Sequence, residues 1–331
     1  MSRRPRQGRM KGSGSLTLPP IGSASPRRPR TLLQPLSCSP MKTFLKWTGI
    51  VLGSLLVLAI IGGFALYTKG SRSIQAAHAV EVAALTVPTD SASLARGAHL
   101  AGVFGCVDCH GDDLAGQEMG DAPPFRLVAS NLTPGGIGRE YTPADWDRAI
   151  RHGVGQDGRA LFVMPSGAYN QMSDRDLASL VAYLQTVAPV ENEFDRVEWK
   201  PMGRILAGGP IDVSKGVHAG TPPASHPDAD STAAWGEYFA MGVCAYCHGP
   251  NLEGQMVEDG PEPILAPDLR AAGQWPAEMF HEVMTTGVTP DGREMNPEVM
   301  PWTMTARMTE TERESLRLYL ASLGPAAPTD A

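Results

Sequence analysis

The sequence predicts an all-α protein in which two small helical domains follow one apolar helix long enough to cross a membrane. The first observation is a repeat that divides residues 86–325 into two similar halves. The second is an uncharged run of 20 residues, 48–67, near the N-terminus. The third is the length of 331 residues, which allows about two domains. The 36 Gly and 29 Pro predict long loops between the helices.

The uncharged run, TGIVLGSLLVLAIIGGFALY, spans about 30 Å as a helix, the thickness of a bilayer's hydrocarbon core. Lys42 and Lys46 precede it, so the positive-inside bias keeps the N-terminus in the cytoplasm and sends the rest of the chain across. We predict a retained single-pass anchor at residues 45–68. The alternative is a cleaved signal peptide, since Ala77-His78-Ala79 resembles a cleavage site. That site lies ten residues beyond the run, and the run exceeds the usual apolar length of signal peptides.

Residues 1–40 are rich in Arg, Pro and Ser and have no periodicity, so we predict a disordered basic extension. Met41 begins a segment typical of the start of a signal anchor. Our hypothesis is that translation starts at Met41 rather than Met1, which would exclude the extension from the native protein. Cys38 lies in this extension and is given no role.

The net charge of −7 combines two unlike parts. The first 80 residues carry 12 Lys and Arg and no Asp or Glu, whereas residues 81–331 carry 16 basic and 35 acidic residues. The acidic part has a formal charge of −19 and would repel phosphates, which excludes nucleic acid as its partner. The opposite signs also indicate different environments for the two parts.

Four cysteines form two identical motifs, Cys106-Val-Asp-Cys109-His110 and Cys244-Ala-Tyr-Cys247-His248. C-x-x-C-H is the attachment pattern of c-type haem. Its two thiols form thioethers with the haem vinyl groups, and the histidine that follows supplies an axial nitrogen to the iron. The sequence therefore predicts two covalently bound haem c groups, with His110 and His248 as iron ligands.

Paired cysteines also occur in two other kinds of site. A bare C-x-x-C can be a redox-active pair, and two such pairs can form a zinc site. Paired zinc motifs usually lie 15–20 residues apart, whereas these motifs are separated by 138 residues. A redox pair also does not require the histidine that follows each motif. Both alternatives are therefore less favoured than haem.

The repeat extends well beyond the cysteine motifs. Residues 141–159 and 275–293 are equal in length, share G-V-x-x-D-G-R, and predict an amphipathic helix followed by a glycine turn. Each half then reaches V-M-P at residues 163–165 or 299–301. A final helix begins in each half with a pattern typical of a capping box, Ser173-x-x-Asp or Thr309-x-x-Glu.

Met164 and Met300 are the predicted sixth iron ligands. They follow the motif histidines by 54 and 52 residues and lie in proline-containing loops. His/Met ligation is the arrangement found in electron-carrying cytochromes c. Methionine is otherwise a flexible core residue, and this is how Met172 and Met308 are interpreted, because each aligned residue directly precedes a helix. No paired carboxylates, phosphate-binding loop or Ser-His-Asp order predicts a catalytic residue.

With these motifs, the chain resembles class I c-type cytochrome domains in tandem. Residues 131–187 are especially similar to the cytochrome c subunits of membrane-bound alcohol and gluconate dehydrogenases, although those subunits usually carry three haem motifs and this chain has two. The class I resemblance covers residues 86–325 and implies small, mostly α-helical domains wrapped around haem. We expect domains at residues 86–190 and 231–325, joined by a proline-rich linker at residues 191–230.

These features predict a dihaem cytochrome in the inner (cytoplasmic) membrane, with its haem domains in the periplasm. It would be an electron-transfer protein rather than an enzyme, carrying electrons from a dehydrogenase or quinol-oxidising complex toward a terminal oxidase or soluble cytochrome. The acidic domains would attract a basic soluble partner. The alternative is a haem enzyme, such as a dihaem peroxidase or thiosulfate-oxidising cytochrome, in which one iron lacks methionine. A haem sensor is disfavoured because only residues 1–40 would serve as a cytoplasmic output segment.

Overall fold

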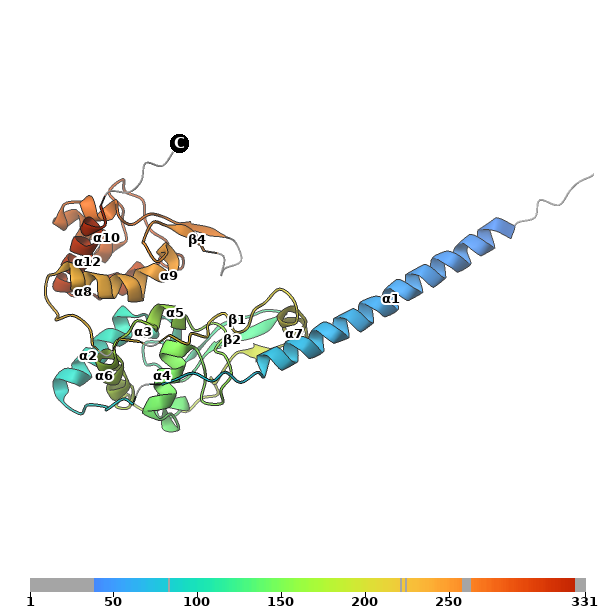
Figure 1. Ribbon diagram of the computed structural model, residues 1–331, viewed down its shortest axis with the longest axis horizontal. Helices are drawn as coiled ribbons and strands as arrows, with labels where there is room; N and C mark the ends of the chain where they lie inside the picture. Colours follow the sequence, from blue (N-terminus) through green and yellow to red (C-terminus); the bar gives the residue numbers. More distant parts are fainter. Residues whose placement is uncertain (1–38, 83, 221, 224, 258–262, 325–331) are drawn as a thin grey trace, which may run out of the picture. The chain divides into compact units, whose positions relative to one another are not determined.

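The computed structural model describes residues 39–324, apart from residues 83, 221, 224 and 258–262 (Figure 1). Residues 1–38, which include Cys38 and most of the extension predicted at residues 1–40, lie outside the described residues. The chain divides into two units, Met1–Leu55 and Leu56–Ala331, and both predicted haem domains lie in the second unit.

The apolar run forms part of a long helix, α1 (Ser39–Ile74), which includes the whole anchor predicted at residues 45–68. Its segment Met41–Ile74 contains a stretch with a mean hydropathy of 2.5, none of it buried inside the protein. Among the described residues, this is the one helix that is long and apolar enough to cross a membrane, judged by length and composition.

The first of the two predicted haem domains is built from helices separated by long loops. These are α2 (Ser91–Val103), α3 (Cys106–His110), the 3-10 turn η1 (Ile137–Arg139), α4 (Pro143–His152), α5 (Ser166–Tyr169) and α6 (Asp174–Leu184). Helices α2 and α6 cross closely at Gly97. A Cβ at this position would lie 2.0 Å from the carbonyl oxygen of Ser179, so the crossing requires glycine. Ser173 caps α6 by accepting a hydrogen bond from the backbone N–H of Asp176. The reciprocal bond of a capping box is not formed, because the backbone N–H of Ser173 donates to the hydroxyl of Tyr238 at 3.1 Å.

The second haem domain repeats this plan. It contains α8 (Ala233–Phe239), the π-helical turn η2 (Ala240–Cys244), α9 (Ala245–His248), the 3-10 turn η3 (Ala272–Gln274), α10 (Ala277–Thr286), α11 (Trp302–Ala306) and α12 (Glu310–Ser322). The close crossing recurs between α8 and α12, where a Cβ on Gly236 would lie 1.9 Å from the carbonyl oxygen of Ser315. Thr309 and Glu312 form the predicted capping box at the start of α12.

The structure is mostly helical, but it also contains short strands that the all-α prediction omitted. Strands β1 (Gln117–Asp121), β2 (Phe125–Ala129) and β3 (Glu198–Trp199) form an antiparallel sheet in that order. Strands β4 (Gln255–Val257) and β5 (Ile264–Ala266) pair in the second domain. Strand β1 is exposed at every residue, so it lacks the alternation of apolar and polar residues that identifies a strand in a sequence.

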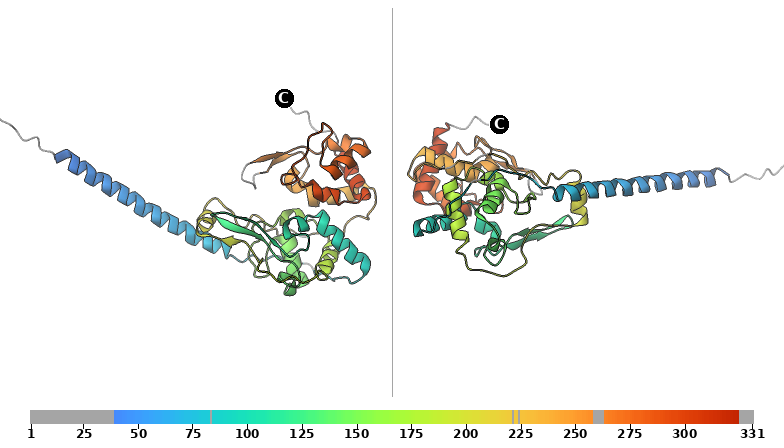
Figure 2. Two further views of the ribbon diagram at one scale, coloured as in Figure 1. Left: turned by 180° about the vertical axis from the view of Figure 1, so that it is seen from behind. Right: turned by 60° about the horizontal axis from the view of Figure 1, so that its bottom comes forward.

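The segment predicted as a linker packs in part onto the first domain. Strand β3 pairs with β2, and α7 (Pro201–Ala207) follows it. The backbone N–H of Asn131 donates to the carbonyl oxygen of Phe194 at 2.7 Å. Helix α7 also contacts the C-terminal part of α1, where a Cβ on Gly70 would lie 1.8 Å from the carbonyl oxygen of Arg204 (Figure 1 and Figure 2). These contacts give this part of the segment fixed neighbours.

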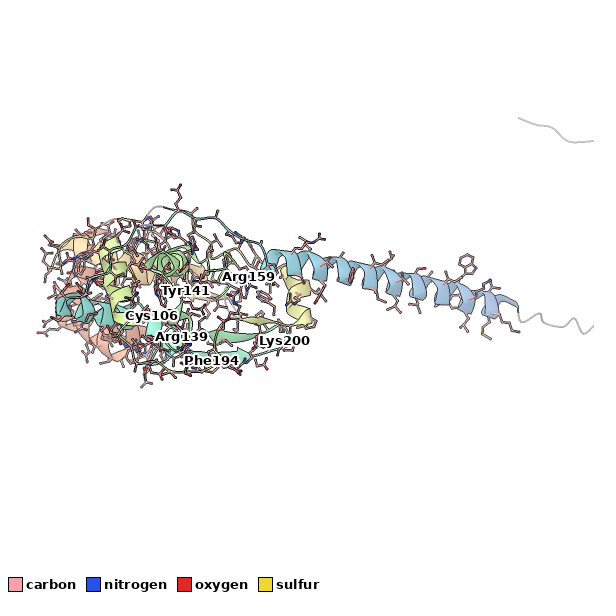
Figure 3. All side chains as sticks on the ribbon, turned by 90° about the horizontal axis from the view of Figure 1, so that it is seen from below. Cys106, Arg139, Tyr141, Arg159, Phe194 and Lys200 are labelled. Atoms are coloured by element: carbon pink, nitrogen blue, oxygen red, sulfur yellow. The ribbon has the colours of Figure 1, made fainter. Side chains whose placement is uncertain are left out.

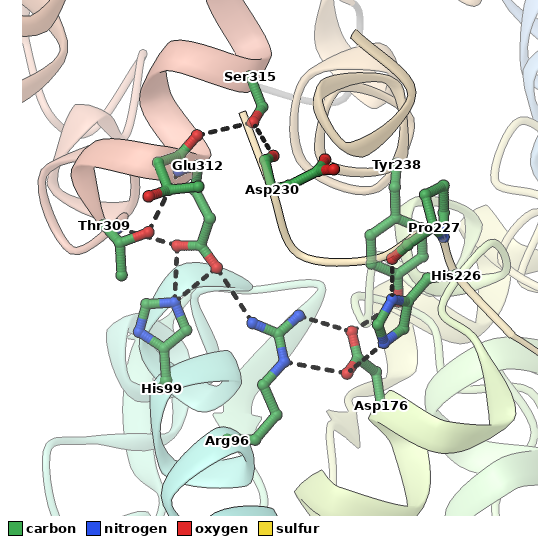
Figure 4. A network of polar contacts seen from close by, with 11 residues as sticks. Arg96, His99, Asp176, His226, Pro227, Asp230, Tyr238, Thr309, Glu312 and Ser315 are labelled. Carbon is green, nitrogen blue, oxygen red and sulfur yellow. Dashed lines mark hydrogen bonds and ion pairs between the residues drawn. The ribbon is translucent and has the colours of Figure 1, made fainter. Parts of the chain in front are cut away.

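A network of charged residues joins the two haem domains (Figure 4). Arg96 of α2 donates two hydrogen bonds to Asp176 of α6, at 3.0 and 2.8 Å, and one to Glu312 of α12 at 3.0 Å. Both carboxylates are almost fully buried, and the Arg96 side chain is 23% exposed. The guanidinium carbon also lies 5.2 Å from the ring centroid of Trp235, a cation–π contact.

Equivalent positions of the repeat meet in this network. Asp176 and Glu312 are both the third residue of the last helix of their domain. The Nε2 of His99 lies 2.8 Å from an oxygen of Glu312, and the hydroxyl of Tyr238 donates to Asp176 at 3.0 Å. His99 and Tyr238 are themselves equivalent, because each lies two residues after the glycine at the close helix crossing. Each domain therefore supplies a matching set of polar groups to the interface.

We predict that Arg96→Met destabilises the protein, because it leaves two buried carboxylates without their shared cation. The expected loss is about 2–3 kcal/mol of unfolding free energy, below the range for fully buried pairs because Arg96 keeps some contact with water. Chemical unfolding of the haem-loaded full chain in detergent measures it. Arg317→Met is the control, since Arg317 pairs with Glu314 inside α12. Equal effects in the two variants would contradict a special role for Arg96.

The same network predicts a loss of stability in acid. Burial alone would raise the pKa of Asp176 and Glu312, but hydrogen bonds from His226 and Arg96 to Asp176, and from His99 to Glu312, outweigh it and lower both pKa values. The stabilisation is therefore complete above the ordinary carboxyl pKa, roughly 4, and is lost as pH falls through the lowered values.

Thermal unfolding between neutral and acidic pH tests this expectation. The thermal stability of Glu312→Gln should depend less on pH than that of the unmodified protein below roughly pH 5, because the variant lacks one carboxyl group with a lowered pKa. The control is Glu298→Gln, which removes an exposed carboxylate. Parallel curves for Glu312→Gln and the unmodified protein would show that the network does not contribute to acid sensitivity.

Candidate functional site

The first C-x-x-C-H motif forms a short helical turn, α3, between two glycines. Gly105 precedes it with φ +71° and Gly111 follows it with φ +84°, conformations that favour glycine. His110 is buried, and its Nδ1 lies 2.7 Å from the carbonyl oxygen of Ser130. Because that carbonyl can only accept a hydrogen bond, Nδ1 carries the proton, and the ring is held in the tautomer whose Nε2 lone pair is available to a metal.

The second motif repeats the hydrogen bond of the histidine and the glycine that ends the turn, although Cys244 here ends the π-helical turn η2. Cys244 and His248 are buried, and the Nδ1 of His248 lies 2.7 Å from the carbonyl oxygen of Pro267. Gly249, with φ +83°, ends the turn as Gly111 does in the first domain. The two histidines therefore share one backbone acceptor arrangement, and each has Nε2 available for coordination.

One cavity in the first domain brings together the four residues that the sequence assigned to the first haem. Cys106, Cys109, His110 and Met164 all line it. Tyr141 and Arg159 line the same cavity and are seen with Cys106 in Figure 3. The other lining side chains are mostly apolar and include Phe104, Val128, Leu132, Ile137, Trp146, Ile150, Leu161, Phe162, Tyr169, Met172, Leu180, Leu184 and Trp199.

The cavity lining fits a flat apolar group that carries iron and carboxylates. Aliphatic and aromatic side chains suit the faces of a porphyrin, and His110 and Met164 offer the nitrogen and sulfur donors of an electron-carrying haem. Trp146 lines this cavity, and its buried indole N–H has no hydrogen-bond partner among the described residues. A haem carboxylate is the kind of acceptor that such an orphaned donor requires.

The titration behaviour of these groups agrees with haem attachment. Burial lowers the pKa of His110 and His248, which favours the neutral imidazole that binds metals. Burial also raises the pKa of Cys106 and Cys244 to about 12. Redox-active cysteine pairs depend on a thiol of lowered pKa, so this environment disfavours the alternative of a thiol–disulfide pair.

The predicted methionines occupy the same turn in both domains. The carbonyl of Met164 accepts a hydrogen bond from the backbone N–H of Ser166 at 2.8 Å, just before α5. The carbonyl of Met300 accepts one from Trp302 at 2.7 Å, just before α11. Both methionines are half-buried. The cavity places Met164 with His110, whereas the pairing of Met300 with His248 stays a prediction from the repeat.

Some site residues were not identified from the sequence. The carbonyl groups of Ser130 and Pro267 orient the two histidines, and each directly precedes an aligned pair, Asn131-Leu132 or Asp268-Leu269. That alignment was the signal that could have located them. Arg196 also lines the first cavity, but it comes from the segment predicted as a linker and has no repeat partner to indicate it.

Comparison with known families assigns both halves of the repeat. Residues 92–184 match the family described as cytochrome C oxidase, cbb3-type, subunit III, and residues 233–324 match cytochrome c. The fold, the motifs and these matches define the chain as a protein with two cytochrome c domains. Domains of this kind hold haem c covalently.

The chain is homologous to cytochrome subunits of several dehydrogenases. It is 28% identical to the cytochrome c subunit of alcohol dehydrogenase (quinone) from Gluconacetobacter polyoxogenes, over 74% of this chain and 59% of the relative. It is 32% identical to the gluconate 2-dehydrogenase cytochrome c subunit of Pantoea cypripedii, over 57% of this chain and 46% of the relative. It is 39% identical to the fructose dehydrogenase cytochrome subunit of Gluconobacter japonicus, over 30% of this chain and 22% of the relative. The chain thus spans less than two thirds of the length of these curated relatives.

Proposed function

We propose that this protein is a membrane-anchored dihaem cytochrome c that transfers electrons as a subunit or partner of a dehydrogenase. The cavity lined by Cys106, Cys109, His110 and Met164 is the observation that carries this proposal, because it combines covalent attachment with two axial donors. The relatives support it, since each is the cytochrome subunit of a dehydrogenase.

Each set of residues has a defined role in this proposal. Cys106 and Cys109 hold one haem, and Cys244 and Cys247 hold the other. Bound haem supplies a one-electron iron couple. His110 and His248 are the proximal ligands, kept neutral by burial and oriented by their backbone hydrogen bonds. For the second haem, the assignment of ligands rests on the sequence repeat.

The sixth ligands we propose are Met164 and Met300. Their sulfur atoms would bind the iron together with the histidine nitrogens and would raise its reduction potential. The cavity that Met164 lines is largely apolar, which disfavours water beside the iron that it would hold. With both axial positions filled by protein, the site suits electron transfer better than binding of a substrate.

We also propose that α1 anchors the protein in the inner membrane with both haem domains in the periplasm. Helix α1 has the length and composition of a membrane span, and the basic residues that precede its apolar run favour a cytoplasmic N-terminus. Dehydrogenase or quinol-oxidising complexes would be the electron donors, and a terminal oxidase or soluble cytochrome the acceptor.

The charges of the domains favour a basic acceptor. Residues 86–190 carry 7 basic and 12 acidic residues, and residues 231–331 carry 5 and 15, giving formal charges of −5 and −10. Opposite charges accelerate association over distances of about a Debye length, so the association rate with a basic soluble partner falls as salt rises.

Replacing a ligand methionine tests the proposed coordination. Met164→Ala and Met300→Ala should each abolish one of the two Met-to-iron absorption bands of the oxidised protein at the red end of its spectrum. Met172→Leu and Met308→Leu are the controls, because these buried methionines align with each other, and Met172 lines the same cavity as Met164. A ligand variant that keeps both bands, or a control that loses one, would contradict the assignment for that haem.

Carbon monoxide separates the electron carrier from the haem-enzyme alternative. An iron with both axial positions filled by protein has no open position, so the reduced native protein should bind carbon monoxide slowly or not at all. Met164→Ala should bind it rapidly at one of its two haems. Rapid binding by the unmodified protein at neutral pH would favour an enzyme, such as a dihaem peroxidase, in place of the carrier.

A further inference from the structure

An ion pair connects the first haem-attachment turn to the second domain. Asp108 lies between the two cysteines of the first motif, and both of its oxygens accept hydrogen bonds from Arg307, each at 2.8 Å. Arg307 also donates to the carbonyl oxygen of Gly102 at 3.2 Å, at the end of α2. The two charged side chains are 32% and 34% exposed, so water only partly screens them.

This ion pair links the parts of the two domains that carry haem ligands. Arg307 directly follows α11, and α11 directly follows the loop that contains Met300. Asp108 lies two residues before His110 within α3. The contact therefore joins the attachment turn of one proposed haem to the loop that presents the sixth ligand of the other.

Apolar contacts beside the pair bring the two attachment segments together. Phe104, two residues before Cys106, lies 6.3 Å from Phe239, measured between ring centroids. A Cβ on Gly242, two residues before Cys244, would lie 2.8 Å from the Phe104 ring. The chains that lead into the two motifs are thus in contact across the interface.

The pair is specific to one side of the interface. In the repeat, Asp108 aligns with Tyr246 and Arg307 aligns with Gln171, so the equivalent positions are uncharged. The network around Arg96 supplies a separate connection between α2, α6 and α12. The Asp108–Arg307 pair is therefore an additional contact placed at the attachment turn.

We propose that Asp108 and Arg307 are positioning residues that hold the first haem-attachment turn at a fixed separation from the segment that follows the Met300 loop, which allows one electron to pass between the haems inside a single chain. One iron is oxidised and the other reduced, with no further reactant. This inference rests on the haem ligation proposed above. Neither residue is assigned as an iron ligand, so their effect is on the position of the segments that carry ligands.

The test uses the haem-loaded full chain in detergent. Asp108→Asn and Arg307→Gln remove the pair with little change in size, and Arg317→Gln is the matched control because it removes the same charge from a pair inside α12. Flavin flash photolysis reduces one haem rapidly, and the concentration-independent phase that follows reports equilibration between the haems. Hydrogen exchange at residues 102–108 and 302–307 gives a second measurement that does not depend on electron transfer.

We expect Asp108→Asn and Arg307→Gln each to slow electron equilibration between the haems roughly two- to fivefold. Loss of one partly exposed ion pair changes the equilibrium between docked and undocked segments by about that factor. The double variant should be no slower than either single variant, because both remove one interaction. Added salt should slow the unmodified protein and leave Arg307→Gln unaffected. Exchange should rise at both segments, and Arg317→Gln should match the unmodified protein throughout.

Three results would overturn the proposal: unchanged equilibration and exchange in Arg307→Gln, multiplicative slowing in the double variant, or equal slowing in Arg317→Gln. Haem content and the Met-to-iron bands are measured on the same samples. A native chain with fewer than two covalent haems would refute the proposed function itself. Two intact haems with unchanged kinetics would refute only the role of the ion pair.

Discussion

The hydrogen bond from each motif histidine to a backbone carbonyl is the constraint on which the arrangement of each haem domain depends. It fixes His110 against Ser130 and His248 against Pro267. Both acceptors come directly after a strand, because β2 ends at Ala129 and β5 ends at Ala266. The short sheets therefore serve the site, since each holds the carbonyl that sets the orientation of an imidazole ring.

A second constraint is the small size of the two domains, in a chain with only 6% aromatic residues. Domains of about 100 residues bury little apolar surface of their own. In the first domain, an apolar cavity lies beside His110, and its walls come largely from the turns and helices between α3 and α6 together with β3. A bound prosthetic group would complete such a core, and its thioether links would keep it in place.

Much of this organisation was predictable from local patterns. The two C-x-x-C-H motifs, the V-M-P loops, the caps at Ser173 and Thr309 and the apolar run within α1 are all recorded in neighbouring residues. The strands were not predictable, because β1 is exposed throughout and β3 has two residues. The partners of Arg96 were also hidden, since they lie 80 and 216 residues away, and its equivalent in the repeat is Trp235. Contacts between domains depend on how the domains dock, which no local pattern records.

The matching positions at the interface between the haem domains have a consequence for symmetry. Asp176 and Glu312 face each other through Arg96, which stacks on its own counterpart, Trp235. The arrangement is that of an approximate twofold axis, the self-complementary contact typical of a homodimer. In a dimer of identical domains, two arginines would meet at that axis and repel each other. A tandem chain can place a cation on one side and an aromatic ring on the other, so joining the domains in one polypeptide permits an interface that identical subunits could not form.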